Sequence, residues 1–328
     1  VSQSLYEYYK GKDHTQTSVD DFAKFVTPDA LKPVAEKLWE IYSDDEDFVN
    51  GVLMLVHQIP YNTTKPAKYP VETLVDNIGD CDMFSYVAAS ILKAGGLDVV
   101  LLYYEDANHM NIGVNLSHVP KDARQPPSYV QHNETRYYIA ECTGGGLNDG
   151  WRVGECPEDL KNEKVQVITL ENCERQSPGQ VSASYFALKD STLTFKSSSV
   201  FVFQGDIILL SGTLSPALSY KDVTLYVKIG FHPWDVLAKV KTDSQGAFKY
   251  PLRVNGTGVC YVRASWSGDE HYAGADSPII SLFILSPFSI SLLALIITLI
   301  CVCVVSIVLK CQKVSDARFI RVPDVPIP

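Results

Sequence analysis

The chain has 328 residues, of which 46% are hydrophobic, and this is enough apolar material to bury the cores of two compact domains. Its 38 acidic and 28 basic residues give a formal net charge of −10, which argues against nucleic-acid binding. The sequence contains no P-loop, no dinucleotide-binding glycine motif and no CxxC pair, so we expect no cofactor and no metal ion.

The first part of the chain predicts two amphipathic helices. The chain begins at Val1 without an apolar leader, which is typical either of a removed signal segment or of a fragment. Thr27, followed by a proline and an acidic residue, is a typical helix start, and the apolar spacing predicts a helix from there to about residue 42. A second helix is expected from Asp45 to about Gln58.

The stretch over residues 76–114 predicts a helix followed by two strands. A lone cysteine, Cys81, stands at the start of the helix, and Asp80 before it is a candidate N-cap. Gly95 and Gly96 end the helix. The apolar residues follow the spacing of one helical face, namely Phe84, Val87, Ala88, Ile91 and Leu92.

Two predicted strands follow this helix, and a lone histidine, His109, stands at the start of the second one. Residues 98–104 are rich in β-branched and aromatic residues and predict the first strand. From Met110 onward apolar and polar residues alternate, so His109, at the start of the second strand, should lie on the face opposite the apolar one.

A thiol and an imidazole in these positions have a clear chemical interpretation. The N-terminus of a helix favours the thiolate of Cys81, and a nearby imidazole such as His109 accepts the thiol proton. Asp80 and Asp82 oppose ionisation by like-charge repulsion. Glu141, which ends the next strand-like run, is the natural acceptor to orient the imidazole.

Four blocks in this region resemble the transglutaminase-like superfamily, and most closely its membrane-linked prokaryotic and archaeal branch. They are GDCDMF, HMNIGV, RYYIAECTG and GWRVGE, within residues 56–155. The resemblance implies an α+β papain/transglutaminase-like catalytic domain over residues 1–170, with Cys81 as nucleophile, His109 as base and Glu141 as orienting residue. The chain departs from the family in having glutamate where many members have aspartate, and in the Asp82-Met83 pair after the cysteine.

Each of the three residues also has an ordinary structural interpretation. A single buried cysteine is most often an inert core residue, and a histidine beside a strand is most often a satisfied structural residue. The ordered set of three favours catalysis, while a domain that keeps the fold but only binds peptide stays open.

A long polar connection over residues 117–135 follows the second strand. Long connections are often functional, so this one is either a lid over the site or a solvated hairpin tip. Residues 165–170 predict a last strand of the first domain, and residues 171–197 predict a linker.

From residue 198 the pattern changes to short strands separated by turn residues. About seven strands over residues 198–285 predict an all-β sandwich that resembles immunoglobulin-like modules of surface proteins. No catalytic residues are evident in this part, and the sandwich is a candidate surface for cell-surface protein partners.

The last part of the chain predicts one transmembrane helix over residues 286–309 and a cytoplasmic tail over residues 310–328. The run contains no charged residue and is long enough to cross about 30 Å of hydrocarbon. Basic residues follow the run and none closely precedes it, so the positive-inside rule predicts a single-pass protein of the cell membrane with both domains outside. Four glycosylation sequons fit that topology, at Asn62, Asn115, Asn133 and Asn255.

Together these features predict a membrane-anchored extracellular enzyme that transfers acyl groups through a thiol. We expect a protein or peptide substrate and hydrolysis of peptide or amide bonds by Cys81, His109 and Glu141, with Gln58 or Tyr61 as second oxyanion donor. The alternatives are a crosslinking transglutaminase and a non-catalytic adhesion or scaffold protein. A disulfide between Cys142 and Cys156 is also expected.

Overall fold

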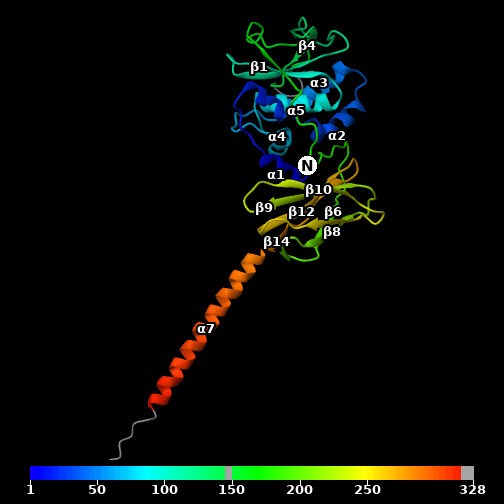
Figure 1. Ribbon diagram of the computed structural model, residues 1–328. Coiled ribbons are helices and arrows are strands. Elements are labelled where there is room, and N and C mark those ends of the chain that lie inside the picture. The colour runs from blue at the N-terminus through cyan, green and yellow to red at the C-terminus, as the bar shows by residue number, and fades with distance from the viewer. Residues whose placement is uncertain (145–149, 319–328) are drawn as a thin grey trace, which may run out of the picture.

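The computed structural model describes residues 1–144 and 150–318, so residues 319–328 of the expected tail lie outside the described residues. Figure 1 shows a helix-covered sheet, a second part built of strands, and one long helix that leads away from the second part. The N-terminus lies where the first two parts meet. The expected boundaries of the domains stay a prediction.

The first part contains a five-stranded antiparallel sheet with the order β3-β4-β2-β1-β5. The strands of this sheet are β1 (Val99–Tyr104), β2 (His109–Val114), β3 (Tyr129–His132), β4 (Thr135–Ala140) and β5 (Gln166–Thr169). In the central pair, Tyr104 lies opposite His109. The strand predicted at residues 165–170 is therefore confirmed as β5, which pairs with β1.

Helices cover one face of this sheet, and α5 (Cys81–Ala94) lies at their centre. The other elements are α1 (Gln3–Lys10), the 3-10 helix η1 (Val19–Phe25), α2 (Pro28–Trp39), α3 (Asp45–Val56) and α4 (Pro70–Asp76). The apolar face predicted for α5 is confirmed, because all five of its residues are buried in the core. Helix α1 and η1 occupy a segment whose sequence shows no clear period.

A second, smaller core fills the opposite face of the sheet. Alternate strand residues divide between the two cores: Leu101 and Ile112 face the helices, whereas Leu102 and Ile139 face the other side. The predicted alternation of β2 is therefore confirmed, because Met110 and Ile112 belong to the main core, whereas His109 and Asn111 lie on the opposite face of the strand.

The second part consists of two sheets packed on each other. One has the order β10-β9-β12-β14-β7, with β13 on β12, and the other has the order β11-β8-β6. The strands are β6 (Thr192–Ser197), β7 (Phe201–Phe203), β8 (Ile207–Ser215), β9 (Asp222–Ile229), β10 (Asp235–Lys241), β11 (Ala247–Arg253), β12 (Gly258–Gly268), β13 (Ala273–Asp276) and β14 (Ile280–Leu285). Leu214 of one sheet and Trp266 of the other belong to one shared core.

The segment that precedes these strands packs against the first part. The Glu174 N–H donates to the carbonyl of Val26, and the Val181 N–H donates to the carbonyl of Ala30 at 2.9 Å. Val181 itself is buried in the main core. The residues predicted as a linker are thus held along the start of α2.

The expected transmembrane helix at residues 286–309 is wrong. This segment belongs to α7 (Pro287–Arg318), and within residues 1–144 and 150–318 we find no helix that is both long enough and apolar enough to cross a bilayer. The expected run ended before the first charged residue, whereas the helix continues from Leu309 into Lys310 and Lys313. The single-pass membrane localisation that rested on this run is withdrawn with it.

The expected fold class is corrected for the same reason and for a second one. The described residues form fourteen strands and seven helices, so strands are twice as numerous as helices. The expected α+β class described only the region around Cys81, and the expected fold also included a transmembrane helix. The strands form a five-stranded sheet in the first part and two packed sheets in the second.

Candidate active site

A cleft of about 370 Å³ opens beside the N-terminal end of α5. Cys81 and His109 both line this cleft. Its walls come from the N-terminal segment, the loop before α4, the start of α5 and the turn between β1 and β2. The lining residues are His14, Gln16, Phe22, Thr63, Thr64, Lys65, Pro66, Ala67, Asp80, Cys81, Asp82, Tyr103, Asn108, His109 and Met110.

Cys81 is the first residue of α5 and is half-buried at the wall of the cleft. The first N–H groups of a helix have no acceptor within the helix, and their dipoles favour a negative charge at this end. His109 lies within hydrogen-bonding reach of the thiol. The sequence placed both residues at the starts of their elements, and this placement is confirmed.

Glu141 follows β4 directly, and its carboxylate contacts a ring nitrogen of His109. The His109 Nε2 atom is 2.9 Å from Glu141 Oε2, and the carboxylate is fully buried. Three further donors hold it: the Asn111 side-chain amide at 3.0 Å, the Thr143 N–H at 2.8 Å and the Thr143 hydroxyl. The structure therefore brings Cys81, His109 and Glu141 together in one chain of contacts.

The electrostatics of this chain favour a charged imidazole. Burial alone lowers the pKa of His109, but hydrogen bonds and charge from Cys81 and Glu141 outweigh it and raise the pKa to about 10. Burial raises the pKa of Glu141, and the contacts with His109, Thr143 and Asn111 more than offset that effect, so its pKa is lowered. The imidazole of His109 is therefore charged at neutral pH and is paired with the ionised carboxylate of Glu141.

Ser85 fixes the start of α5 against β2. Its hydroxyl lies 2.7 Å from the carbonyl of Cys81 on its own helix and 3.1 Å from the carbonyl of Met110 on the strand. Because Met110 is the neighbour of His109, this buried hydroxyl links the backbones on both sides of the thiol–imidazole contact.

The two acidic residues that flank Cys81, Asp80 and Asp82, have unusual surroundings. Asp80 occupies the N-cap position of α5, but its side chain makes no capping hydrogen bond. One of its oxygens accepts the Thr64 N–H at 3.3 Å, and the other is buried without a hydrogen-bond partner. Burial, followed by the hydrogen bond and charge of Asp80, raises the pKa of Asp82 to about 8.

The two expected second oxyanion donors differ in position: Gln58 is bound to its own helix, whereas Tyr61 lies near enough to Cys81 for the charge of the thiol to contribute to its raised pKa, after burial. Gln58 donates its side-chain amide to the carbonyl of Met54 at 3.1 Å, on its own helix. Tyr61 is 59% exposed. Neither residue is among the described residues that line the cleft.

The long connection over residues 117–135 lies away from the cleft. The Ser117 N–H donates to Asp45 at 2.6 Å, and the Lys121 N–H donates to Glu46 at 2.7 Å. Arg124 forms an ion pair with the buried carboxylate of Glu155 at 2.6 Å. These contacts tie the connection to α3 and to the region after β4, and none of its described residues lines the cleft.

The expected disulfide between Cys142 and Cys156 is wrong, because both thiols are free and buried. Cys142 belongs to the core between the sheet and the helices, whereas Cys156 belongs to the core on the opposite face. Closeness in sequence did not show that the sheet separates them.

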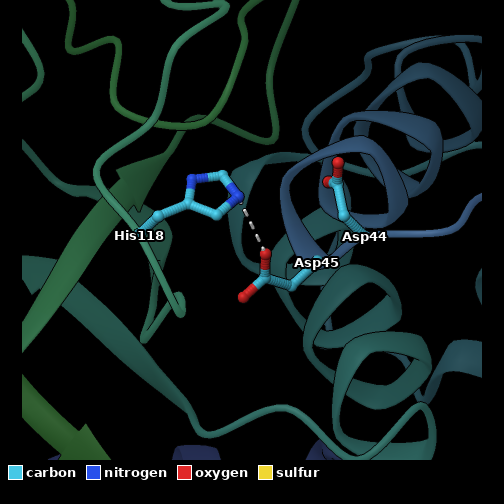
Figure 2. Close-up of side chains that lie close together, drawn as sticks. All are labelled: Asp44, Asp45 and His118. Carbon is cyan, nitrogen blue, oxygen red and sulfur yellow. Dashed lines mark ion pairs between the residues drawn. The ribbon is translucent and has the colours of Figure 1, made fainter.

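A group of possible cation ligands lies at the start of α3, outside the cleft. Figure 2 shows His118 directed at Asp45, while the carboxylate of Asp44 points elsewhere. Asp44 caps α3 by accepting the Asp47 N–H at 2.9 Å, and Asp45 accepts backbone N–H groups of Glu46 and Ser117. The backbone thus already satisfies these carboxylates, which fix the start of α3 and the chain after β2.

Sequence reasoning missed the residues that support the three predicted ones. The ring of His57, at the C-terminus of α3, lies 3.0 Å from the carbonyl of Glu141, and burial lowers the pKa of this histidine. Asn111 and Thr143 hold the carboxylate. Only Asn111 carried a signal, because it shares the polar face of β2 with His109; the contacts of His57 join elements far apart in the chain.

Comparisons with known proteins give distant similarities only. No family model matches the chain, and no curated protein matches it in sequence. It is similar to a candidate cysteine protease from Cytophaga hutchinsonii, with TM-score 0.29 and 12% identity over 48% of this chain and 57% of that one. It is also similar to red sea bream transglutaminase, with TM-score 0.27 and 9% identity over 86% of this chain and 60% of that one.

A chitin-binding domain from Burkholderia pseudomallei is similar over 26% of this chain and 56% of that one, with TM-score 0.21 and 15% identity. The chain thus spans little more than half the length of these three structures. Distant neighbours with a cysteine-protease-like or transglutaminase-like description exist, but similarities this weak carry no argument about this chain.

Proposed function

We propose that this protein is a thiol-dependent acyl-transfer enzyme that hydrolyses peptide or amide bonds. The observation that carries the proposal is the contact chain from Cys81 through His109 to the buried carboxylate of Glu141, at the wall of an open cleft. A thiol that serves only as a core residue does not need an imidazole held by a fully buried carboxylate.

The steps follow from the positions of these groups. Cys81 gives its proton to His109, and the thiolate attacks a carbonyl carbon, forming a carbon–sulfur bond. The carbon–nitrogen bond then breaks, and the imidazolium returns the proton to the leaving amine. Water, deprotonated by His109, attacks the thioester and releases the acid and the free thiol.

The groups around Cys81 and His109 orient the imidazole, bind the oxyanion and contact the substrate. Glu141 keeps the imidazole oriented and stabilises its charged form. The N–H groups of the first turn of α5 are the candidate donors to the developing oxyanion. Phe22 and Tyr103, which pack edge to face at 5.2 Å, give the cleft an apolar wall for a substrate side chain.

The test is the pH dependence of alkylation at Cys81 in the full-length protein. At pH 6 an ordinary thiol is only about 0.3% thiolate. We expect Cys81 to react with iodoacetamide at least tenfold faster than an unperturbed thiol, as followed by mass spectrometry of its peptide. Cys81→Ala should abolish cleavage of a peptide library, whereas Cys260→Ala, in the core of the second part, should leave it unchanged.

A Cys81 that reacts no faster than an ordinary thiol would contradict the proposal. That result would favour the alternative in which the cleft only binds a partner.

A further inference from the structure

The proposed mechanism leaves unused the two acidic residues that flank Cys81. Asp80 is 8% exposed, and its Oδ1 atom is buried without a hydrogen-bond partner. Among the described residues, no ion pair includes Asp80 or Asp82. Asp80 is buried and Asp82 is half-buried. Two negative charges this close together, with no cation of their own, are disfavoured.

The geometry of Asp82 offers a partner for the unpaired oxygen. Asp82 accepts the Met83 N–H at 2.7 Å through one oxygen, and its carboxyl group lies within hydrogen-bonding reach of Asp80. A carboxylate is only an acceptor, so two charged carboxylates cannot hydrogen-bond to each other. A proton on Asp82 makes it a donor, and that proton satisfies Asp80.

We propose that Asp82 is a protonated carboxylic acid at neutral pH, donates its proton to Asp80, and is a positioning residue that leaves one negative charge, rather than two, beside Cys81. The inference rests on the proposed thiol chemistry. The raised pKa of Asp82, caused first by burial and then by Asp80, agrees with it.

The other charged and titratable groups around Asp80 and Asp82 are engaged elsewhere, exposed or neutral, so none of them neutralises this acid pair. His109, across the cleft on β2, lies close enough to Cys81 for the thiol to contribute to its raised pKa. His14 is engaged by Glu72 at 2.8 Å, and Lys65 is exposed at the edge of the cleft. Burial and the nearby negative charges raise the pKa values of two phenols, which stay neutral near pH 8: Tyr61 and Tyr86.

Loss of the Asp82 proton has a defined consequence for the nucleophile. A second negative charge then lies one residue from Cys81 and disfavours the thiolate. The imidazolium proton of His109 returns to the sulfur, and the reactive ion pair is depleted. We expect the rate of alkylation at Cys81 to fall, by up to about tenfold, as pH rises through about 8, since one pKa unit of coupling changes the ion-pair equilibrium about tenfold.

The experiment compares iodoacetamide labelling of Cys81 from pH 5 to pH 10 in three full-length proteins. In the native protein the fall near pH 8 is expected. Asp82→Asn keeps a neutral donor to Asp80 at every pH, so its rate should stay level until His109 titrates near pH 10. Asp106→Asn removes an exposed carboxylate outside the cleft and should behave like the native protein.

A second measurement uses the native protein alone, so it requires neither a folded variant nor enzymatic activity. The carboxyl carbon of Asp82 in the native protein is followed by nuclear magnetic resonance with labelled aspartate, and we expect a midpoint near pH 8. A midpoint below about pH 5, as for an ordinary aspartate, overturns the inference.

The two proposals fail in different ways. If Cys81 is fast but the native and Asp82→Asn profiles coincide, the role of Asp82 is refuted and the proposed function stands. If Cys81 is slow at every pH, the proposed function is refuted, and the role of Asp82 as a positioning residue falls with it, whatever proton the carbon titration finds.

Discussion

Glu141 is the residue whose surroundings depend most on the charge of its partner. Its buried carboxylate accepts from His109, Asn111 and Thr143. The pKa of His109 is raised to about 10, so the ion pair contributes stability that is complete below the ordinary histidine pKa of about 6.5 and is lost as pH rises through about 10. The site is therefore charged throughout the neutral range.

We predict that Glu141→Gln lowers the rate of Cys81 alkylation at pH 7 by tenfold or more. The amide keeps the shape of the carboxylate but cannot stabilise the imidazolium, so the pKa of His109 should fall toward its ordinary value. The alkylation rate and the histidine ring titration by nuclear magnetic resonance measure both effects.

The matched control for this change is Glu155→Gln. Glu155 is also a buried carboxylate, but it binds Arg124 outside the cleft. It should cost stability without changing the reactivity of Cys81. Equal alkylation rates in the Glu141→Gln and native proteins would show that the carboxylate does not hold the charge.

At the scale of elements, the site depends on how α5 meets β2. Ser85 and Ser90 are both buried hydroxyls of α5 that bond to a carbonyl four residues earlier. Only Ser85 also contacts the strand, through the carbonyl of Met110, whereas Ser90 accepts the N–H of Thr27. Variants of these two serines therefore distinguish an effect on helix stability from an effect on the contact between α5 and β2.

We predict that Ser85→Ala and Ser90→Ala each lower the free energy of unfolding by about 1 kcal/mol. Only Ser85→Ala should also slow alkylation of Cys81, by several-fold, because it frees the strand that carries His109. Urea denaturation and labelling kinetics test the two effects separately. A similar loss of reactivity in both variants would assign the effect to helix stability alone.

At the scale of the whole molecule, α1 joins the first part to the second. Ser4 hydrogen-bonds to Asp276, and Glu7 forms an ion pair with Arg263 at 2.9 Å. Arg263 is almost fully buried and stacks over the ring of Trp234, 4.2 Å from its centre. The segment before the first predicted helix is therefore part of the contact between the two parts.

We predict that Glu7→Gln lowers the free energy of unfolding by about 1–3 kcal/mol, because it leaves the buried guanidinium of Arg263 without its charged partner. The control is Glu36→Gln. Glu36 pairs with Lys32, and both side chains are more than half exposed, so this change should lower the free energy of unfolding by no more than about 0.5 kcal/mol. Urea denaturation of both full-length variants measures the difference. Equal midpoints would mean that the pair contributes nothing.

The fate of the acyl-enzyme also belongs to this scale, and we predict that hydrolysis prevails over transfer to an amine. Transfer needs a second, water-excluding channel that holds the amine, whereas the described residues around Cys81 form one cleft. A glutamine-containing peptide library with a tagged primary amine should give cleaved or deamidated products without the tag. Efficient incorporation of the tag that depends on Cys81 would reverse this prediction.

Local pattern alone was sufficient for much of the site and its surroundings. The apolar spacing of α5, the alternation of β2 and the glycines after α5 depend on residues a few positions apart, and the positions of Cys81, His109 and Glu141 at element ends follow from them. The catalytic roles of these three residues stay predictions that the alkylation experiments test.

Only the tertiary structure decided the rest, because the deciding contacts join residues far apart in the chain. The contacts of His57, Ser85 and α1, the opposite faces of Cys142 and Cys156, and the unpaired oxygen of Asp80 have no signature in local sequence. Local hydrophobicity likewise misjudged residues 286–309, since a charge-free run does not determine where its helix ends. Local pattern reports which face of an element is apolar, whereas packing determines which groups that face meets.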